Sequence, residues 1–190
     1  MESNLPSSQE ILKELNKERY KRNFRKALKS TAYSLITVSA IAVLVAVLLL
    51  PVLRIYGTSM TPSLTEGDYV VSVKGSSFKT GDIIAFYYNN KILVKRIIAQ
   101  SGDWVDIDPE GNVYVNNELL EESYISDKSF GDCNISLPYQ VPESRVFVLG
   151  DHRSVSVDSR NTAVGCVAEE QIVGKIIFRV WPLSDLGAVR

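Results

Sequence analysis

The feature that most constrains this chain is an uncharged segment near its N-terminus. Residues 30–53 contain no Asp, Glu, Lys or Arg, and residues 41–50 are all apolar. A helix needs about 20 such residues to cross a bilayer. The apolar core of a cleaved signal peptide is shorter, about 7–15 residues, and follows a short basic region. We therefore predict a permanent transmembrane anchor over residues 30–53, rather than a cleaved signal sequence or a buried core helix.

Basic residues are unevenly distributed about this segment. Residues 1–29 carry eight Lys or Arg, whereas Arg54 stands nearly alone on the other side. Because Lys and Arg accumulate on the cytoplasmic side of membrane helices, we expect residues 1–29 to be a cytoplasmic basic tail and residues 54–190 an extracytoplasmic domain. The tail suits either a short surface helix or a solvated, disordered leader, and we favour the leader.

Residues 54–190 contain a series of short segments that are typical of β-strands. Asn89-Asn90 predicts a tight hairpin, and Asp108-Pro-Glu-Gly111 suits another turn. The polar residues 121–142 predict a long irregular surface segment, and Ala168–Gln171 suits a short helix. The expected strands are 69–73, 82–88, 91–98, 104–107, 112–115, 145–149 and 175–181. Many short strands and few amphipathic helices predict a mainly β fold, a barrel or a sandwich.

The same domain holds both cysteines, Cys133 and Cys166, and the single histidine, His152. An oxidising exterior permits a disulfide, but sequence separation does not decide whether the two thiols meet. One histidine without clustered cysteines argues against zinc, and calcium and nucleotide motifs are absent from the sequence. We expect no metal, no cofactor and no nucleic-acid partner.

Three short segments carry residue types that are associated with catalysis: Gly57–Leu64 (Gly-Thr-Ser-Met-Thr-Pro-Ser-Leu), Val94–Ile98 (Val-Lys-Arg-Ile-Ile) and Leu149–Arg160 (Leu-Gly-Asp-His-Arg-Ser-Val-Ser-Val-Asp-Ser-Arg). Taken alone, Ser59 is typical of a turn and Lys95 of an exposed strand position. The alternation of a strand, however, puts Lys95 between Leu93 and Ile97 on one face. Apolar neighbours lower a lysine pKa from its usual value of about 10.4 and so favour the neutral amine.

In this order and behind one anchor, the three segments resemble the bacterial type I signal peptidase family, in particular its single-anchor members of Gram-positive type. The resemblance covers residues 30–190. It implies a single transmembrane helix followed by a β-rich catalytic domain of coiled sheets. It also implies a membrane-bound serine endopeptidase with a Ser-Lys dyad, which removes signal peptides from preproteins at the lipid bilayer of the cell membrane. Cutting would follow small residues, in an Ala-x-Ala pattern.

The resemblance assigns roles to matching residues. Ser59 is the nucleophile, with its own backbone N–H as an oxyanion donor, and Lys95 is the general base. Ser156 hydrogen-bonds and orients the lysine amine. The residues implied to line shallow substrate pockets are Met60, Leu64, Leu93 and Val94. A buried ionic network supports the dyad, with Arg96 paired to acids of the third segment; its members are Arg96, Asp151, Arg153, Asp158 and Arg160.

The chain departs from the family's pattern at Gly57, His152 and Val155. Some relatives supply a side-chain hydroxyl to the oxyanion at the first position, so Gly57→Ser could add a donor, unless the glycine has a positive φ. His152 is an alternative base, but the endoplasmic-reticulum branch that uses histidine has it where this chain has Lys95. Competing functions are a maturation peptidase for one dedicated substrate, a self-cleaving regulator, and a tethered β domain that binds partners or cell-wall components without catalysis.

Overall fold

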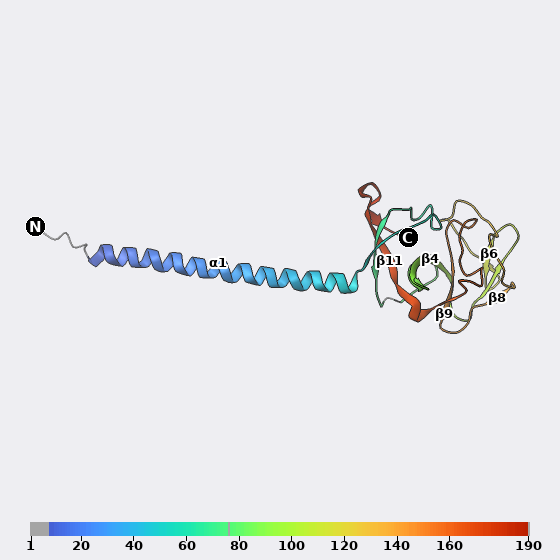
Figure 1. Cartoon of the computed structure of the whole chain (residues 1–190), viewed down its shortest axis with the longest axis horizontal. Coiled ribbons are helices and arrows are strands. Elements are labelled where there is room, and N and C mark those ends of the chain that lie inside the picture. The colour runs from blue at the N-terminus through green and yellow to red at the C-terminus, as the bar shows by residue number, and fades with distance from the viewer. Residues whose placement is uncertain (1–7, 76, 190) are drawn as a thin grey trace, which may run out of the picture. The chain divides into compact units, whose positions relative to one another are not determined.

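The structure is a computed structural model that describes residues 8–75 and 77–189. The chain divides between Leu48 and Leu49 into two compact units. The first contains the helix α1 (Ser8–Leu49) except its last residue, and the second contains all the described strands (Figure 1).

The helix α1 runs without interruption through both the basic tail and most of the apolar segment. Its sequence contains no Gly or Pro, and ion pairs one turn apart, Lys17 to Glu14 (3.4 Å) and Lys21 to Glu18 (2.9 Å), add local support. The disordered leader that we expected is therefore wrong for residues 8–29, while residues 1–7 lie outside the described residues. By length and composition α1 can cross a membrane, with a mean hydropathy of 2.2 in its most apolar window.

The helix ends four residues before the predicted end of the anchor. Pro51 has no amide hydrogen to continue a helix and disfavours helical geometry at Leu50. Val52–Arg54 instead form strand β1, which pairs with Tyr69–Val71. The apolar residues Val52 and Leu53 thus belong to the β-rich unit, since their backbone amides are used in a sheet.

The β-rich unit contains two antiparallel sheets. The larger has the order β1-β2-β11-β3-β4-β9-β10, with β12 paired to β11, and the smaller has the order β7-β6-β5-β8. Within the unit, β6 and β8 lie on the side away from β11 (Figure 1). The strands are β1 (Val52–Arg54), β2 (Tyr69–Val73), β3 (Ile83–Tyr88), β4 (Lys91–Ala99), β5 (Trp104–Ile107), β6 (Val113–Val115), β7 (Glu118–Leu119), β8 (Tyr139–Gln140), β9 (Arg145–Leu149), β10 (Val167–Ala168), β11 (Ile172–Trp181) and β12 (Gly187–Ala188). Two short 3₁₀ helices complete it, η1 (Glu169–Gln171) and η2 (Leu183–Asp185). The mainly β prediction is confirmed.

Two strands of the larger sheet each have a backbone edge that pairs with no other strand among the described residues. Strand β1 is the last strand of its sheet and pairs only with β2 among the described residues. Strand β4 pairs with β3 from Lys91 to Arg96, but its pairing with β9 begins only at Arg96. Residues 91–95 therefore have no described ladder partner on their β9 side.

Apolar clusters hold these strands in place. One cluster packs residues of β1's continuation, β2, β3 and β11 around Met60 and Leu64. Another joins the two sheets, because Val105 and Ile107 of β5 pack with Phe147 and Leu149 of β9. Both elements that carry the catalytic motifs are thus anchored in packed cores rather than in free loops.

The two cysteines do not form a disulfide in this structure. Cys166 is buried, which raises its pKa to about 11, and Tyr139 and Arg145 lie against it. The disulfide that the sequence left open is therefore absent, and both residues are free thiols.

Candidate active site

Ser59 lies in a short turn that follows β1. Backbone bonds from Thr61 N to Thr58 O (3.1 Å) and from Leu64 N to Met60 O (2.9 Å) close the turn. Met60 and Leu64 are buried in the cluster beneath it. The carbonyl of Ser59 accepts a hydrogen bond from the backbone N–H of His152 (3.1 Å). The first and third sequence motifs therefore meet at the Ser59 backbone.

Lys95 is buried in the middle of β4, only 3% exposed, and its Nζ lies 2.7 Å from Ser59 Oγ. Burial is the main cause that lowers the pKa of Lys95 to about 8. The charge of Asp158 opposes this effect, that of Arg160 adds to it, and that of Asp151 opposes it. A substantial fraction of the amine is thus neutral slightly above neutral pH, as a general base requires.

A cavity of about 620 Å³ opens beside this pair. One wall comes from β1 and the residues after it, and the other from the first half of β4. The lining residues are Val52–Gly57, Ser59, Met60 and Lys91–Lys95. Met60, Leu93 and Val94 lie in the wall, as the resemblance implied. Leu64 does not: it is fully buried against Met60 and Val70 in the cluster below, so it supports the wall rather than lining it.

The ionic residues of the motifs include two buried ion pairs, Arg96 with Asp151 and Arg160 with Asp158. The guanidinium of Arg96 donates to both oxygens of Asp151 (2.9 and 2.7 Å). Asp158 pairs with Arg160 through two bonds of 2.9 Å and accepts a bond from the Gly150 N–H (3.0 Å). The sequence analysis named Asp158 as a further candidate partner of Arg96; in the structure Asp158 forms its ion pair with Arg160.

Arg153 has a partner that the sequence analysis missed. Its guanidinium donates to Gly150 O (3.0 Å) and forms a buried ion pair with Glu122. Glu122 also accepts a bond from the Tyr124 hydroxyl (2.9 Å), and the Tyr124 ring lies 3.9 Å from the Arg96 guanidinium carbon. Part of the segment that we predicted to be a surface excursion therefore packs against the buried arginines of the ionic residues.

A charge count could have indicated that a carboxylate was missing from the predicted network. The predicted network held three arginines but only two aspartates, and a buried charge needs a partner. The missing third carboxylate had to come from outside the three motifs. Nothing in the local pattern of residues 121–142 identified which acid it would be.

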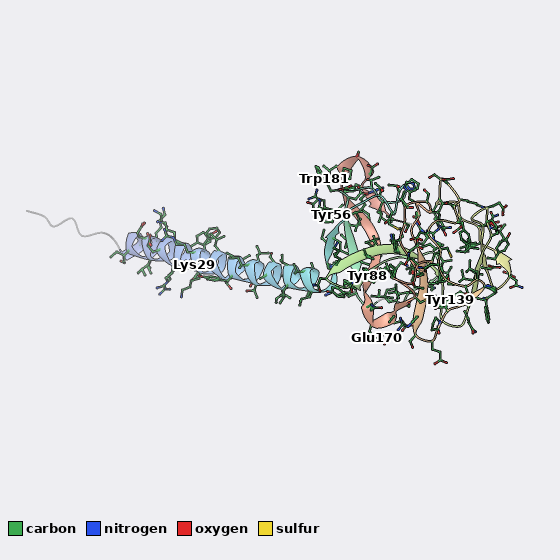
Figure 2. The ribbon with its side chains drawn as sticks, turned by 45° about the vertical axis from the view of Figure 1, so that its right-hand side comes forward. Lys29, Tyr56, Tyr88, Tyr139, Glu170 and Trp181 are labelled. Atoms are coloured by element: carbon green, nitrogen blue, oxygen red, sulfur yellow. The ribbon has the colours of Figure 1, made fainter. Side chains whose placement is uncertain are left out.

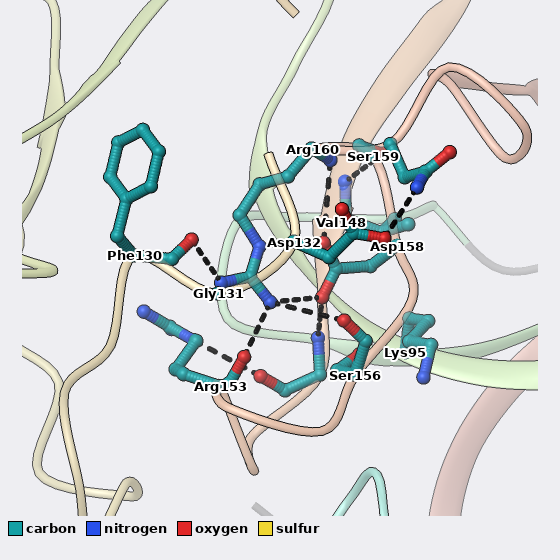
Figure 3. Close-up of polar contacts among 12 residues, drawn as sticks. Lys95, Phe130, Gly131, Asp132, Val148, Arg153, Ser156, Asp158, Ser159 and Arg160 are labelled. Atoms are coloured by element: carbon teal, nitrogen blue, oxygen red, sulfur yellow. Dashed lines mark hydrogen bonds and ion pairs between the residues drawn. The ribbon is translucent and has the colours of Figure 1, made fainter. Parts of the chain in front are cut away.

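Ser156 does not make the hydrogen bond that the resemblance implied. Its Oγ is buried and, among the described residues, has no hydrogen-bond partner. In Figure 3 no dashed line joins Ser156 Oγ to Lys95. The backbone explains where the Ser156 hydroxyl lies. The Ser156 N–H donates to His152 O (3.1 Å), which closes a tight turn, and in this turn Ser156 Oγ packs against Gly150.

His152 makes a different contact from that of a catalytic base. Its Nδ1 lies 3.0 Å from Thr61 Oγ1. Since the Thr61 hydroxyl donates to Thr58 O (2.8 Å), the ring N–H must be the donor to Thr61. In the part of the chain that the structure describes, the ring makes no bond to Ser59 Oγ. Its backbone N–H, not its imidazole, contacts the candidate nucleophile.

The backbone conformation of Gly57 decides whether a Gly57→Ser substitution raises or lowers activity. Its φ is +77°, where a side chain is strained by about 1–2 kcal/mol, although the space around a Cβ is open. We expect Gly57→Ser to lower kcat/KM several-fold despite its hydroxyl. Gly57→Ala is the matched control, because it has the same strain without the hydroxyl. A Gly57→Ser protein faster than the unchanged chain would contradict this expectation.

A β-rich unit in which a serine hydroxyl meets a buried lysine amine defines a candidate Ser-Lys hydrolase. The family model described as signal peptidase, peptidase S26, matches residues 28–181. The chain belongs to this family.

Two relatives are similar to this chain in sequence. Signal peptidase IB of Staphylococcus aureus (strain COL) is 37% identical over 151 residues, which are 69% of this chain and 78% of that protein. Thylakoidal processing peptidase 1 of Arabidopsis thaliana is 36% identical over 146 residues, 68% of this chain but only 41% of that protein. The crystal structure of a signal peptidase I from Enterococcus faecalis V583 aligns with a TM-score of 0.45 and 28% identity, over 53% of this chain and 97% of that one.

Proposed function

We propose that this chain is a membrane-bound serine endopeptidase that removes signal peptides from exported preproteins. The observation that carries the proposal is the 2.7 Å approach of the buried Lys95 amine to Ser59 Oγ at an apolar cavity. Family membership supports the reaction, and this geometry supports the dyad.

In the proposed mechanism the neutral Lys95 amine accepts the proton of Ser59 as Oγ attacks the scissile carbonyl. The backbone N–H of Ser59 donates to the oxyanion of the tetrahedral intermediate. The Lys95 ammonium then gives its proton to the departing amine of the mature protein, which leaves an acyl-enzyme on Ser59. A water molecule, deprotonated by Lys95, hydrolyses this ester and restores Ser59.

The sheet edges suggest how the substrate binds. Strand β1 and residues 91–95 of β4 both line the cavity and both have a free ladder edge among the described residues. An extended peptide can add to such edges through its backbone amides. Met60, Leu93 and Val94 line the cavity, and we propose that they restrict the positions before the cut to small side chains, in an Ala-x-Ala pattern.

The membrane orientation is also a proposal, which the charge asymmetry about α1 supports. With the basic tail in the cytoplasm, residues 54–190 lie outside the cell membrane. We expect protease added to intact protoplasts to degrade the β-rich unit. A cytoplasmic marker protein is the control for intact cells. Protection of the β-rich unit until the membrane is permeabilised would overturn the orientation.

The function is tested by incubating the detergent-solubilised full chain with a preprotein that carries an Ala-x-Ala site. We expect one N-terminal shortening, after the second Ala, and none with Ser59→Ala, which removes only the hydroxyl. Several unrelated preproteins should be cut, which distinguishes this function from that of a maturation peptidase for one substrate. A folded wild-type chain that cuts none of them, or equal cutting by Ser59→Ala, would refute the proposal.

A further inference from the structure

The cavity beside Ser59 has two exposed cations in its walls and no Asp or Glu among its described lining residues. Arg54 comes from β1 and Lys91 from the start of β4. Lys95 is the third basic lining residue, but it is buried against Ser59. The two exposed charged side chains among the described lining residues are therefore both positive.

Neither exposed cation is neutralised by a carboxylate within the described chain. The guanidinium carbon of Arg54 lies 5.2 Å from the ring centroid of Tyr56 and 5.9 Å from that of Tyr69 (Tyr56 is labelled in Figure 2). Lys91 makes no hydrogen bond or ion pair with any described residue. Five other cations of the same unit are paired: Arg96 with Asp151, Arg153 with Glu122, Arg160 with Asp158, Lys175 with Asp82, and Arg179 with Asp68.

The strand geometry places Lys91 at a defined distance from the dyad. Lys91 and Lys95 are four residues apart on β4, which corresponds to about 13 Å, and they share one face of the strand. A peptide paired with β4 advances at the same rate. If the last residue before the cut lies opposite Lys95, the third residue before the cut lies opposite Leu93. The fifth residue before the cut, or one near it, then lies opposite Lys91.

We propose that Arg54 and Lys91 form a subsite that selects a carboxylate, Asp or Glu, about five residues before the cleavage site. This inference rests on the proposed function and deepens it. The subsite favours preproteins with an acidic residue there and disfavours those with Lys or Arg. Because both cations are exposed, the preference is modest, about two- to fivefold for an acid over a neutral residue, and it weakens with salt.

The test uses preproteins that differ at a single residue, with Glu, Gln or Lys in turn at the fourth, fifth and sixth positions before the cut. The full chain is assayed in uncharged detergent. At one of these positions we expect kcat/KM to fall in the order Glu, Gln, Lys, with about a four- to 20-fold range at low salt that shrinks at about 0.5 M salt. Equal processing of all three residues at every position would overturn the subsite while leaving the proposed function intact, whereas no processing of any substrate would refute that function itself.

Charge exchange identifies the residues responsible. Lys91→Glu, which leaves Arg54 beside one new carboxylate, is expected to remove the preference, and the double variant Arg54→Gln with Lys91→Glu should invert the order, so that the Lys substrate becomes the best. Lys74→Glu is the matched control, because Lys74 is an exposed lysine of the same unit that does not line the cavity. It should preserve the original order. An unchanged order with folded Lys91→Glu and with the double variant, or an inverted one with Lys74→Glu, would overturn the assignment.

Discussion

Replacing Lys95 by arginine is expected to lower kcat for preprotein processing by a factor of about 10²–10⁴, the usual contribution of a general base. Arginine keeps the positive charge and much of the length of lysine, but its guanidinium does not deprotonate at any workable pH. A role for Lys95 in charge alone would survive this change, and a role as base would not. Processing is followed by the size shift of a purified preprotein, with Lys74→Arg as the control.

A second substitution separates loss of chemistry from loss of fold. Lys95→Met keeps an unbranched side chain of similar size but has no amine. The folded-state pKa of Lys95, about 8, lies below the usual value of 10.5. The unfolded chain therefore binds the proton more tightly, and burial of the ammonium destabilises the fold most below about pH 8. Lys95→Met should be inactive yet more stable than the unchanged chain at neutral pH, with the difference shrinking as the pH rises from 8 towards 10.5. An active Lys95→Arg or Lys95→Met protein would remove the proposed base.

Asp151→Ala is expected to destabilise the β-rich unit by about 3–5 kcal/mol, because it leaves the Arg96 guanidinium buried without its counter-charge. Both side chains of this pair are almost inaccessible, at 2% and 0% exposure. Urea unfolding of the detergent-solubilised chain can be followed by tryptophan fluorescence, since both tryptophans, Trp104 and Trp181, lie in this unit. Activity should also fall, because the next residue, His152, holds the Ser59 carbonyl.

Two controls define the cause of that destabilisation. Asp127→Ala removes an exposed carboxylate from the same unit and should change the unfolding free energy by no more than about 0.5 kcal/mol. Replacing both partners, as Arg96→Met with Asp151→Leu, removes the unpaired charge and should recover part of the lost stability. A loss below about 1 kcal/mol for Asp151→Ala would show that the buried pair does not stabilise the fold as its geometry implies.

The strands that the sequence predicted are those long enough to show alternation or a β-branched run. Tyr69–Val73, Lys91–Ile98 and Arg145–Leu149 all appear as strands, and the two turns between predicted strands are hairpins. The strands β7, β8, β10 and β12 have two residues each, too few for any periodic pattern. Strand β1 was hidden because its apolar residues continue the apolar run of the helix, and only its pairing with β2 distinguishes it.

The candidate site was predictable where it depends on motifs and unpredictable where it depends on partners. The motifs predicted a pairing of Ser59 with Lys95, which the structure brings within hydrogen-bond distance, and the alternation of β4 predicted the burial of the lysine. They did not reveal Glu122 and Tyr124, which come from a segment without a pattern and reach the site only through tertiary contacts. Nor did they show that Leu64 supports the cavity wall from below, or that Ser156 turns its hydroxyl to Gly150, since both depend on side-chain packing.

The pH dependence of kcat/KM, measured with a preprotein whose cleavage region has no titratable side chain, tests the Ser-Lys account most directly. Only the neutral amine of Lys95 can accept the Ser59 proton, so the rate should rise about tenfold per pH unit and level off above a midpoint near 8. The same midpoint should remain in His152→Ala. Two results together would contradict the account: a midpoint at about pH 6.5, the ordinary pKa value for a histidine, and loss of activity with His152→Ala in a folded protein.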